Sequence, residues 1–284
     1  MKATVRAAAV QLGGDWLDPD ANRRRIVGRL TELGERGVEL AVFPELATSG
    51  YCRTGELAAF DADFARRYHA CAETIPGPTT DAVAEVCAGC GMHATVGVLE
   101  RDPTVPMLQY NSIALVGPRG LIGRYRKVHL PLSEKHYFRA GNELPVFTTD
   151  LGVIGLSICY DGRFPEHART LALSGAEVIC ASWAVQEIPG LVDDENLHAR
   201  SYVRAQENSV YFVSANRAGR EAGVGFIGHS AIAAPNGAVV AASHTRDEDV
   251  VEAVLEANVL ERNRQLLPIF ADRRPELYGK LVGR

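Results

Sequence analysis

Three residues with reactive side chains, Glu45, Lys127 and Cys159, each follow or end an apolar segment of the chain. A cysteine thiolate can attack an amide carbonyl carbon, and a carboxylate can take the thiol proton and later activate water. A fixed ammonium group can stabilise the charge of the tetrahedral intermediate. These residue types suit cleavage of a carbon–nitrogen bond, provided that the fold brings the ends of the three segments to one place.

The segment around Cys159 predicts a strand, a sharp turn and a helix. The apolar run 151–158 ends at Cys159, and Pro165 fits the first position of a helix that Gly175 closes. A cysteine at such a corner lies near a helix N-terminus, whose dipole favours the thiolate. We therefore expect a low-pKa thiol that iodoacetamide alkylates before the other cysteines. The alternative is that Cys159 is a small buried hydrophobic residue.

Glu45 and Lys127 are also expected at strand ends. Glu45 comes directly after the apolar run 38–43 and Pro44, at the carboxyl end of a predicted strand, where α/β sheets place their chemistry. Lys127 ends a predicted strand over 121–127. The structural alternatives are a salt-bridged or capping glutamate and a solvated lysine. A buried pair of the two would couple their titrations.

Buried strands and amphipathic helices alternate along nearly the whole chain, which predicts the α/β class. No repeat, low-complexity segment or linker interrupts the pattern, so we expect a single domain over residues 1–284. The expected strands are 4–11, 38–43, 93–99, 111–116, 121–127, 151–158, 177–182, 210–215, 227–233, 239–242 and 250–255. The expected helices are 19–36, 63–73, 79–90, 165–173, 195–208 and 259–267, with an ordered loop over 132–138.

The composition narrows the class of protein. The chain has 284 residues, of which 46% are hydrophobic and 23% charged, as in ordinary soluble enzymes. The net charge of -5 argues against nucleic acid as a partner. No apolar run is long enough to span a membrane and residues 1–12 lack a signal-peptide core, so we expect no membrane association and a cytoplasmic protein. Cys87 and Cys90 form a lone CxxC pair, which we interpret as two ordinary helical cysteines.

Three motifs resemble those of the nitrilase superfamily, the carbon–nitrogen hydrolases. They are Phe43-Pro-Glu45-Leu, Tyr125-Arg-Lys127-Val-His129-Leu-Pro and Ile158-Cys159-Tyr-Asp-Gly-Arg-Phe-Pro-Glu166. They occur in the family's order, and the resemblance extends from the first strand to the segment that ends at Tyr278. Together, in this order, the three motifs are highly specific.

The resemblance implies a four-layer α-β-β-α sandwich. It implies that Glu45 is the general base, Lys127 the oxyanion stabiliser and Cys159 the nucleophile, with Glu134 as a second active-site glutamate. No metal or organic cofactor is expected. Members of the family usually pair through the helix after the cysteine and through the C-terminal segment, so we expect a homodimer or larger homo-oligomer that uses the tail, about 259–284.

The residues after the cysteine resemble the amidase and carbamoylase branches. True nitrilases typically carry Trp-Glu there, whereas this chain has Tyr160-Asp161. Arg163 matches one of the arginines with which D-carbamoylases hold the substrate carboxylate, but Gly162 stands in place of the other and Leu132 in place of a histidine. A small linear amide and an N-carbamoyl compound both remain open as substrates, with water as the second reactant. The alternatives are a nitrile hydrolase on the same triad and a non-catalytic binding protein of the same fold.

Four residues are candidates for substrate binding: Tyr160, Arg163, Trp183 and His136. The Tyr160 backbone N–H can donate to an oxyanion, and Arg163 can hold a carboxylate with its bidentate fork. Trp183 ends a predicted strand, and His136 lies in the loop that can shape the pocket rim. The alternatives are an ion pair of Arg163 with an acidic neighbour, plain packing of Trp183 and a solvated loop around His136.

The predicted helix 195–208 carries charged residues at helical spacing. Arg200, Arg204 and Glu207 recur three to four positions apart, which places their side chains on one face of the helix. We interpret this face as salt-bridged.

Overall fold

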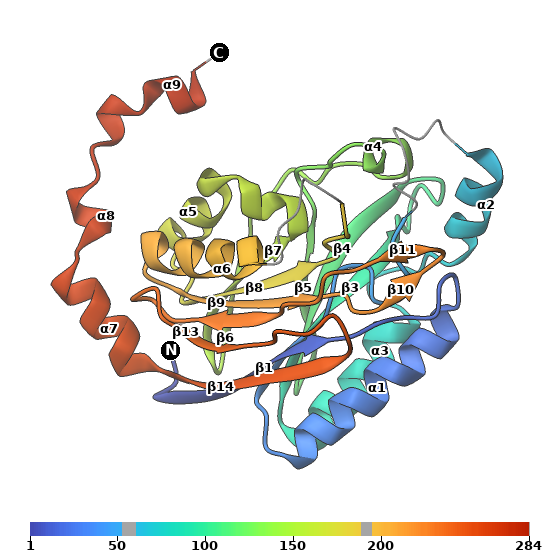
Figure 1. The fold of residues 1–284 in the computed structure, drawn as a ribbon, viewed down its shortest axis with the longest axis horizontal. Helices are drawn as coiled ribbons and strands as arrows, with labels where there is room; N and C mark the ends of the chain where they lie inside the picture. Colours follow the sequence, from blue (N-terminus) through green and yellow to red (C-terminus); the bar gives the residue numbers. More distant parts are fainter. Residues whose placement is uncertain (53–60, 189–194, 284) are drawn as a thin grey trace.

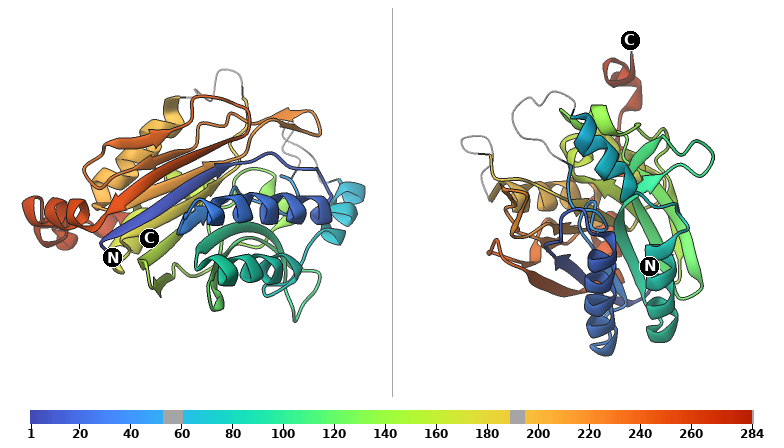
Figure 2. Two further views of the ribbon diagram at one scale, coloured as in Figure 1. Left: turned by 90° about the horizontal axis from the view of Figure 1, so that it is seen from below. Right: turned by 90° about the vertical axis from the view of Figure 1, so that its right-hand side faces the viewer.

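Two six-stranded sheets lie face to face, and helices cover their outer sides, in a four-layer α-β-β-α arrangement (Figure 1; Figure 2). The computed structural model describes residues 1–52, 61–188 and 195–283. The four-layer arrangement confirms the expected fold class. Within the described residues, no helix is long and apolar enough to cross a membrane.

The first sheet has the strand order β14-β1-β2-β3-β4-β5. Its strands are β1 (Thr4–Gln11), β2 (Leu40–Val42), β3 (His93–Arg101), β4 (Gln109–Gly117), β5 (Gly120–Arg126) and β14 (Asp249–Glu256). Strands β1, β2 and β3 run parallel to one another, and the remaining pairs are antiparallel. Helices α1 (Pro19–Glu35) and α3 (Pro78–Cys90) pack on its outer face, and α2 (Ala62–Ala70) follows the first undescribed segment.

The second sheet has the strand order β13-β12-β9-β8-β7-β6. Its strands are β6 (Val146–Thr149), β7 (Gly152–Ile158), β8 (Val178–Trp183), β9 (Tyr211–Asn216), β12 (Ala231–Ala233) and β13 (Val239–Ala242). Strands β7, β8 and β9 are parallel, and helices α5 (Pro165–Leu173) and α6 (Glu195–Asn208) cover the outer face. The smaller elements are α4 (Glu134–Tyr137), the 3₁₀ helix η1 (Cys159–Arg163), β10 (Arg220–Glu221) and β11 (Val224–Gly225).

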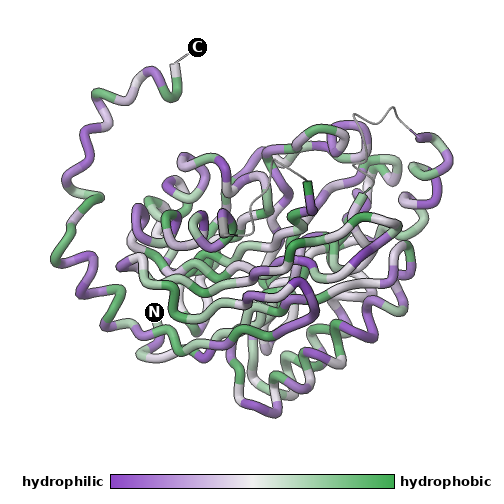
Figure 3. Tube along the Cα trace, viewed as in Figure 1, coloured by the Kyte–Doolittle hydropathy of each residue, from purple (hydrophilic) through white to green (hydrophobic). Residues whose placement is uncertain are grey.

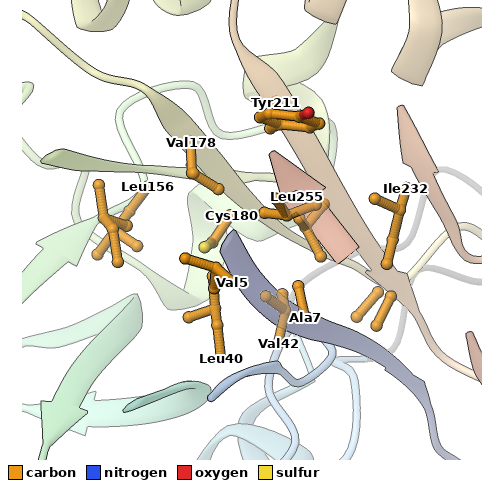
Figure 4. Close-up of a cluster of buried hydrophobic side chains, with 14 of the residues drawn as sticks. Val5, Ala7, Leu40, Val42, Leu156, Val178, Cys180, Tyr211, Ile232 and Leu255 are labelled. Atoms are coloured by element: carbon orange, nitrogen blue, oxygen red, sulfur yellow. The ribbon is translucent and has the colours of Figure 1, made fainter. Parts of the chain in front are cut away.

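The central strands, such as β2, β8 and β9, are buried on both faces, which explains why they read as continuous apolar runs. In β1, Ala7 and Ala9 join the core between the two sheets, whereas Ala8 and Val10 face α1 and α3. This alternation is the two-residue period of a strand. Side chains from both sheets meet in the central core (Figure 4). The four layers are held together by apolar surface that folding removes from water. This surface is buried in three places: between the two sheets and beneath the helices on each outer side.

The two sheets are joined at the strand ends that carry the predicted chemistry. The Ser182 hydroxyl at the end of β8 donates to the Phe43 carbonyl after β2, over 2.7 Å. The Glu45 N–H donates to the Trp183 carbonyl over 3.3 Å. In the second sheet the parallel register pairs Ile158 with Ser182, which brings the end of β7 beside the end of β8. Segments far apart in the sequence therefore end at one place.

Most predicted elements are confirmed, and the differences are local. The segment 132–138 contains the one-turn helix α4 instead of a loop. The strand expected over 227–233 is confined to β12, because positive φ angles at Gly228 and His229 interrupt the extended conformation. Strands β6, β10 and β11 were not predicted, since they have two to four residues and lack a clear apolar run.

The C-terminal segment begins on the sandwich, where Leu260 joins the central core, and then leads away from it (Figure 1). It consists of α7 (Ala257–Leu266), α8 (Ile269–Asp272), the 3₁₀ turn η2 (Pro275–Leu277) and α9 (Gly279–Val282). Hydrophobic positions are interspersed along it (Figure 3). Several of its large apolar side chains are exposed, namely Leu266, Leu267, Leu277, Leu281 and Val282.

Candidate active site

Glu45 follows β2 in a turn whose backbone is held from two sides. Gly97 of β3 lies so close that a Cβ atom there would come within 2.2 Å of the Pro44 carbonyl oxygen. The Arg217 guanidinium donates to the carbonyl oxygens of Glu45 and Leu46, over 3.1 and 3.0 Å. The side chain of Glu45 is fully buried. Its position is therefore fixed by the backbone on which it sits.

Lys127 joins two carboxylates at the centre of the site. It directly follows β5, is fully buried, and places Nζ 2.6 Å from Glu45 Oε1 and 2.7 Å from Glu134 Oε1. Asn111 donates to the same Glu45 oxygen over 2.6 Å, and the Tyr51 hydroxyl donates to the same Glu134 oxygen. Within the described residues, the second oxygen of each carboxylate, Oε2, is buried without a hydrogen-bond partner. Each glutamate thus keeps one oxygen available for a proton or a ligand.

The three charges of this cluster determine one another's protonation. Burial alone would lower the pKa of Lys127, but the carboxylates of Glu134 and Glu45 outweigh it and raise that pKa well above its usual value. Burial raises the pKa of Glu134 to about 7, against the attraction of Lys127 and with the repulsion of Glu45. Lys127 therefore stays cationic, while Glu134 can carry a proton near neutral pH. A permanent cation in a dry site is suited to stabilise an oxyanion.

Cys159 lies directly after β7, at the start of η1, in a strained backbone conformation. Its φ angle of 41° is in the left-handed region that L residues rarely adopt. The Asp161 carboxylate fixes this turn, because it accepts hydrogen bonds from the Ile158 N–H over 3.1 Å and from the Tyr125 hydroxyl over 2.6 Å. The His129 backbone N–H and ring Nδ1 lie 3.1 and 2.8 Å from the same carboxylate. Burial would raise the pKa of Asp161, but the bond to His129 and the other partners hold it below its usual value.

The prediction of a low-pKa thiol at Cys159 is wrong. Burial raises the pKa of this thiol to about 12, and the charge of Glu45 acts in the same direction. Lys127 and the backbone N–H of Ala184, which bonds to the thiol, act in the opposite direction without cancelling the rise. The expected helix dipole is weak here, because Cys159 begins a five-residue 3₁₀ turn and α5 begins only at Pro165. A nucleophilic attack by this sulfur would therefore require a neighbouring base to take the thiol proton.

We accordingly expect iodoacetamide to alkylate Cys90 before Cys159. Cys90 is exposed, whereas a pKa of about 12 leaves Cys159 with a thiolate fraction roughly a thousand-fold below that of an ordinary cysteine. Peptide mapping by mass spectrometry after brief exposure near neutral pH should find the label on Cys90. The early label should be absent from Cys90→Ser protein. Modification of Cys159 ahead of Cys90 would contradict the raised pKa.

The four substrate-binding candidates lie at different distances from this cluster. Trp183 ends β8 fully buried, and within the described residues its indole Nε1 has no hydrogen-bond partner. Tyr160 is half-buried next to Cys159, and Arg163 is exposed at the end of η1. His136 is exposed on α4 and shares no contact with the catalytic cluster in the part of the chain that the structure describes. The structure thus brings Trp183 and Tyr160 close to the catalytic cluster, but not His136.

The structure changes the interpretation of two arginines. Arg204 pairs with Glu207 over 2.5 Å, as the helical spacing predicted. Arg200 forms no ion pair within the described residues, so its assignment to a salt-bridged face is wrong; its guanidinium carbon lies 6.0 Å from the centre of the Trp183 ring. Arg163 also forms no ion pair in the described part of the chain, which removes the acidic-neighbour alternative.

Three residues that hold the site were not identified from the sequence: Tyr51, Asn111 and Arg217. Asn111 had one available signal, a polar side chain inside an apolar strand. Arg217 is fully buried and forms an ion pair with Glu221, which a residue pattern does not reveal. Tyr51 lies outside any predicted element. All three act on Glu45 or Glu134 through contacts that only the folded chain creates.

Among the described residues, the candidate metal ligands are three histidines, His198, His229 and His244. Their ligand atoms lie within 4.8 Å of one another, and two of the three side chains are buried. His198 Nε2 also lies 3.1 Å from the Ser243 carbonyl oxygen. This group shares no residue with the catalytic cluster. In that cluster the ammonium of Lys127 already occupies the position between two carboxylates that a cation would take.

Comparison with known proteins gives one consistent result. The profile of the carbon–nitrogen hydrolases matches residues 6–265. A nitrilase of Pyrococcus abyssi is 37% identical over 281 residues, which are 96% of this chain and 99% of the relative. The N-carbamoylputrescine amidase of Arabidopsis thaliana is 34% identical over 225 residues, or 72% and 73% of the two chains. The crystal structure of Saccharomyces cerevisiae Nit3, a member of branch 10 of the nitrilase superfamily, matches with a TM-score of 0.81 and 27% identity over 94% of this chain and 95% of that one.

Proposed function

The chain belongs to the carbon–nitrogen hydrolase family, and from this premise we propose that it hydrolyses a small linear amide or N-carbamoyl compound through a thioester at Cys159. Glu45 acts as the general base and Lys127 stabilises the oxyanion. Glu134 holds Lys127 in place and adjusts the charge of the site. Ammonia is the first product, and water releases the second.

One arrangement supports this proposal above all others. The buried ammonium of Lys127 is shared by Glu45 and Glu134, and the Oε2 atom of Glu45 remains buried and unpartnered within the described residues. An isolated carboxylate oxygen in a dry site is costly unless a proton or ligand meets it. The charge of Glu45 acts on the Cys159 thiol, which retains its proton at neutral pH. A base with a vacant oxygen near a protonated nucleophile is the pair that general-base catalysis requires.

The reaction follows from these groups. Glu45 takes the thiol proton as the Cys159 sulfur bonds to the carbonyl carbon, and the carbonyl electrons move to the oxygen, where Lys127 and the Tyr160 N–H stabilise them. The oxyanion collapses, the carbon–nitrogen bond breaks, and protonated Glu45 returns its proton to the departing ammonia. A water molecule then gives its proton to Glu45 and attacks the thioester. Collapse of this second oxyanion breaks the carbon–sulfur bond, the leaving sulfur takes the proton back from Glu45, and the thiol, the free Glu45 carboxylate and the carboxyl product result.

The function is tested by ammonia release from a panel of amides, N-carbamoyl amino acids and nitriles. The proposal expects turnover of amides or carbamoyl compounds and little from nitriles. The likeness to a nitrilase keeps nitriles in the panel as the second candidate. If only a nitrile is converted, with its acid as product, the nitrilase alternative is correct. If purified protein releases no ammonia from any member of the panel, the alternative of a non-catalytic binding protein is correct.

We further propose that the chain forms one domain and that its tail makes homo-oligomer contacts. The described part of the tail, which is expected over about 259–284, leads away from the sandwich (Figure 1), and several leucines and a valine in it are exposed. Exposed apolar side chains on an extended segment are typical of an interface. A cytoplasmic location without nucleic-acid or membrane partners is kept as part of the same proposal.

Removal of residues 268–284 should lower the oligomeric state. The deletion takes away Leu277, Leu281 and Val282 and leaves the two sheets and their helices intact. Light scattering coupled to size exclusion should report a smaller particle than the full-length protein forms, with circular dichroism unchanged. Equal masses for the two proteins would exclude the tail as an assembly contact.

A further inference from the structure

Two arginines lie beside the turn that carries the nucleophile. Arg163 ends η1, four positions after Cys159, and its side chain is exposed. Arg200 comes from α6 and is half-buried. Neither forms an ion pair within the described residues, although the chain has more acidic than basic residues. The half-buried Arg200 in particular needs an explanation, because burying a cation without a counter-ion is costly.

Gly162 shows how closely Arg200 approaches the nucleophile's turn. A Cβ atom at this position would lie 3.4 Å from the Arg200 Cδ atom and 3.7 to 3.9 Å from the indole of Trp183. The aliphatic part of Arg200 therefore passes over the turn next to Trp183. The indole Nε1 of Trp183, which would lie 3.9 Å from that Cβ atom, is buried without a hydrogen-bond partner among the described residues. A guanidinium group and an unused N–H donor thus gather at one place.

Arg204 provides a contrast on the same helix. It donates from Nε to the Gly162 carbonyl over 3.0 Å and pairs with Glu207 over 2.5 Å, so its structural role is satisfied. Arg200, one helical turn earlier, has neither contact. Burial and the charge of Arg163 lower the pKa of Arg200, and the Cys159 thiolate would act the other way. An anion placed between the two arginines would relieve this repulsion.

We propose that Arg200, together with Arg163 and the indole N–H of Trp183, binds a carboxylate at the end of the substrate away from the scissile bond. The inference rests on the proposed function and narrows it to amides or carbamoyl compounds of small carboxylic acids. A planar carboxylate matches the guanidinium fork and can also accept from the indole N–H. A substrate with an ammonium group at that end, such as N-carbamoylputrescine, would place its positive charge beside the two guanidinium groups. This repulsion disfavours its binding.

A matched series of amides tests this assignment. Succinamate, butyramide and β-alaninamide share the amide and two methylene groups and differ in their ends, which are anionic, neutral and cationic. We expect kcat/KM to follow that order. Arg200→Met should lower the ratio of succinamate to butyramide about 10- to 100-fold, mainly through KM, because a charge-assisted hydrogen bond is lost. Arg200→Glu should shift the preference toward β-alaninamide.

The controls separate this inference from the proposed function. Arg262→Met removes an exposed arginine from α7 and should keep the wild-type ratio. Calorimetric titration of Cys159→Ala protein with succinamate measures binding without turnover, and adding Arg200→Met should weaken it about 10-fold or more. If wild-type protein releases no ammonia but this difference in binding holds, the proposed function fails and the carboxylate site stands. An unchanged ratio and unchanged binding in the Arg200→Met proteins would overturn the assignment.

Discussion

Replacing Cys159 by alanine should abolish amide hydrolysis while leaving the fold intact. In the proposed mechanism Cys159 forms the covalent intermediate, and loss of such a group lowers kcat by about 10⁴-fold or more. Alanine lacks only the sulfur atom of cysteine, so the substitution does not disturb the hydrogen bonds of Asp161 that hold the turn. Residual rates should therefore be measured by ammonia release at high enzyme concentration, next to a thermal unfolding curve.

A buried cysteine outside the site offers the control. Cys180 lies in β8, fully buried in the core between the sheets. Cys180→Ala removes the same atom from the interior and should retain near wild-type kcat. A Cys159→Ala protein that keeps more than about a hundredth of the activity would show that another group attacks the amide.

Replacing Lys127 by methionine should reduce both activity and stability. Without the ammonium, the tetrahedral intermediate loses its cation, which costs about 10²–10³-fold in kcat or more. The buried carboxylates of Glu45 and Glu134 then face each other without a shared partner. Removal of one member of a buried ionic cluster costs about 3–5 kcal/mol of folding free energy. Chemical denaturation and steady-state kinetics on the same preparation measure the two effects.

The double variant Lys127→Met/Glu134→Gln distinguishes the two consequences. Neutralising Glu134 removes the repulsion left by Lys127→Met, so part of the lost stability should return. The lost activity should not return, since no cation has been restored at the oxyanion. Recovery of both together would mean that Lys127 acts only as a structural counter-ion.

The sequence predicted most strands and helices because each of these elements has a local signal, whereas the four layers were implied by the resemblance to the nitrilase superfamily. Strand β1 and helix α6 begin and end where the apolar pattern placed them. The Asp18-Pro19 pair marked the start of α1, where the Asp18 side chain accepts a bond from the Ala21 N–H. Long buried elements have enough residues to show the periodic pattern of apolar side chains. The strands β6, β10 and β11 are too short for such a pattern, and β6 and its partner are set by the folded sheet.

The positions of Glu45, Lys127 and Cys159 at strand ends could also be predicted, but not how their charges interact. The thiol pKa was misjudged because the helix-dipole argument considers only the local turn. The folded chain adds desolvation of the partly buried thiol and the charge of Glu45, which act in the opposite direction. Burial is a property of all four layers, so no local motif can report it.

The role of Arg200 illustrates the same limit of a local pattern. Its spacing from Arg204 and Glu207 favoured a salt-bridged helix face, and for Arg204 this is correct. The side chain of Arg200 instead passes over Gly162, 38 positions earlier in the chain, where the absence of a Cβ leaves room for it. Gly162, which stands in the sequence where carbamoylases have their second arginine, therefore leaves room for Arg200 from α6.

The central claim is that the reaction passes through a thioester at Cys159, and trapping it is the most direct test. The slowest amide of the panel is mixed with excess enzyme, and samples are quenched in acid at several times during the first turnover. Intact-protein mass spectrometry should show an increase equal to the acyl group of the substrate, and peptide mapping should place it on Cys159. Release of ammonia during that turnover with no acyl group at any time, or with the acyl group on another residue, would contradict the account.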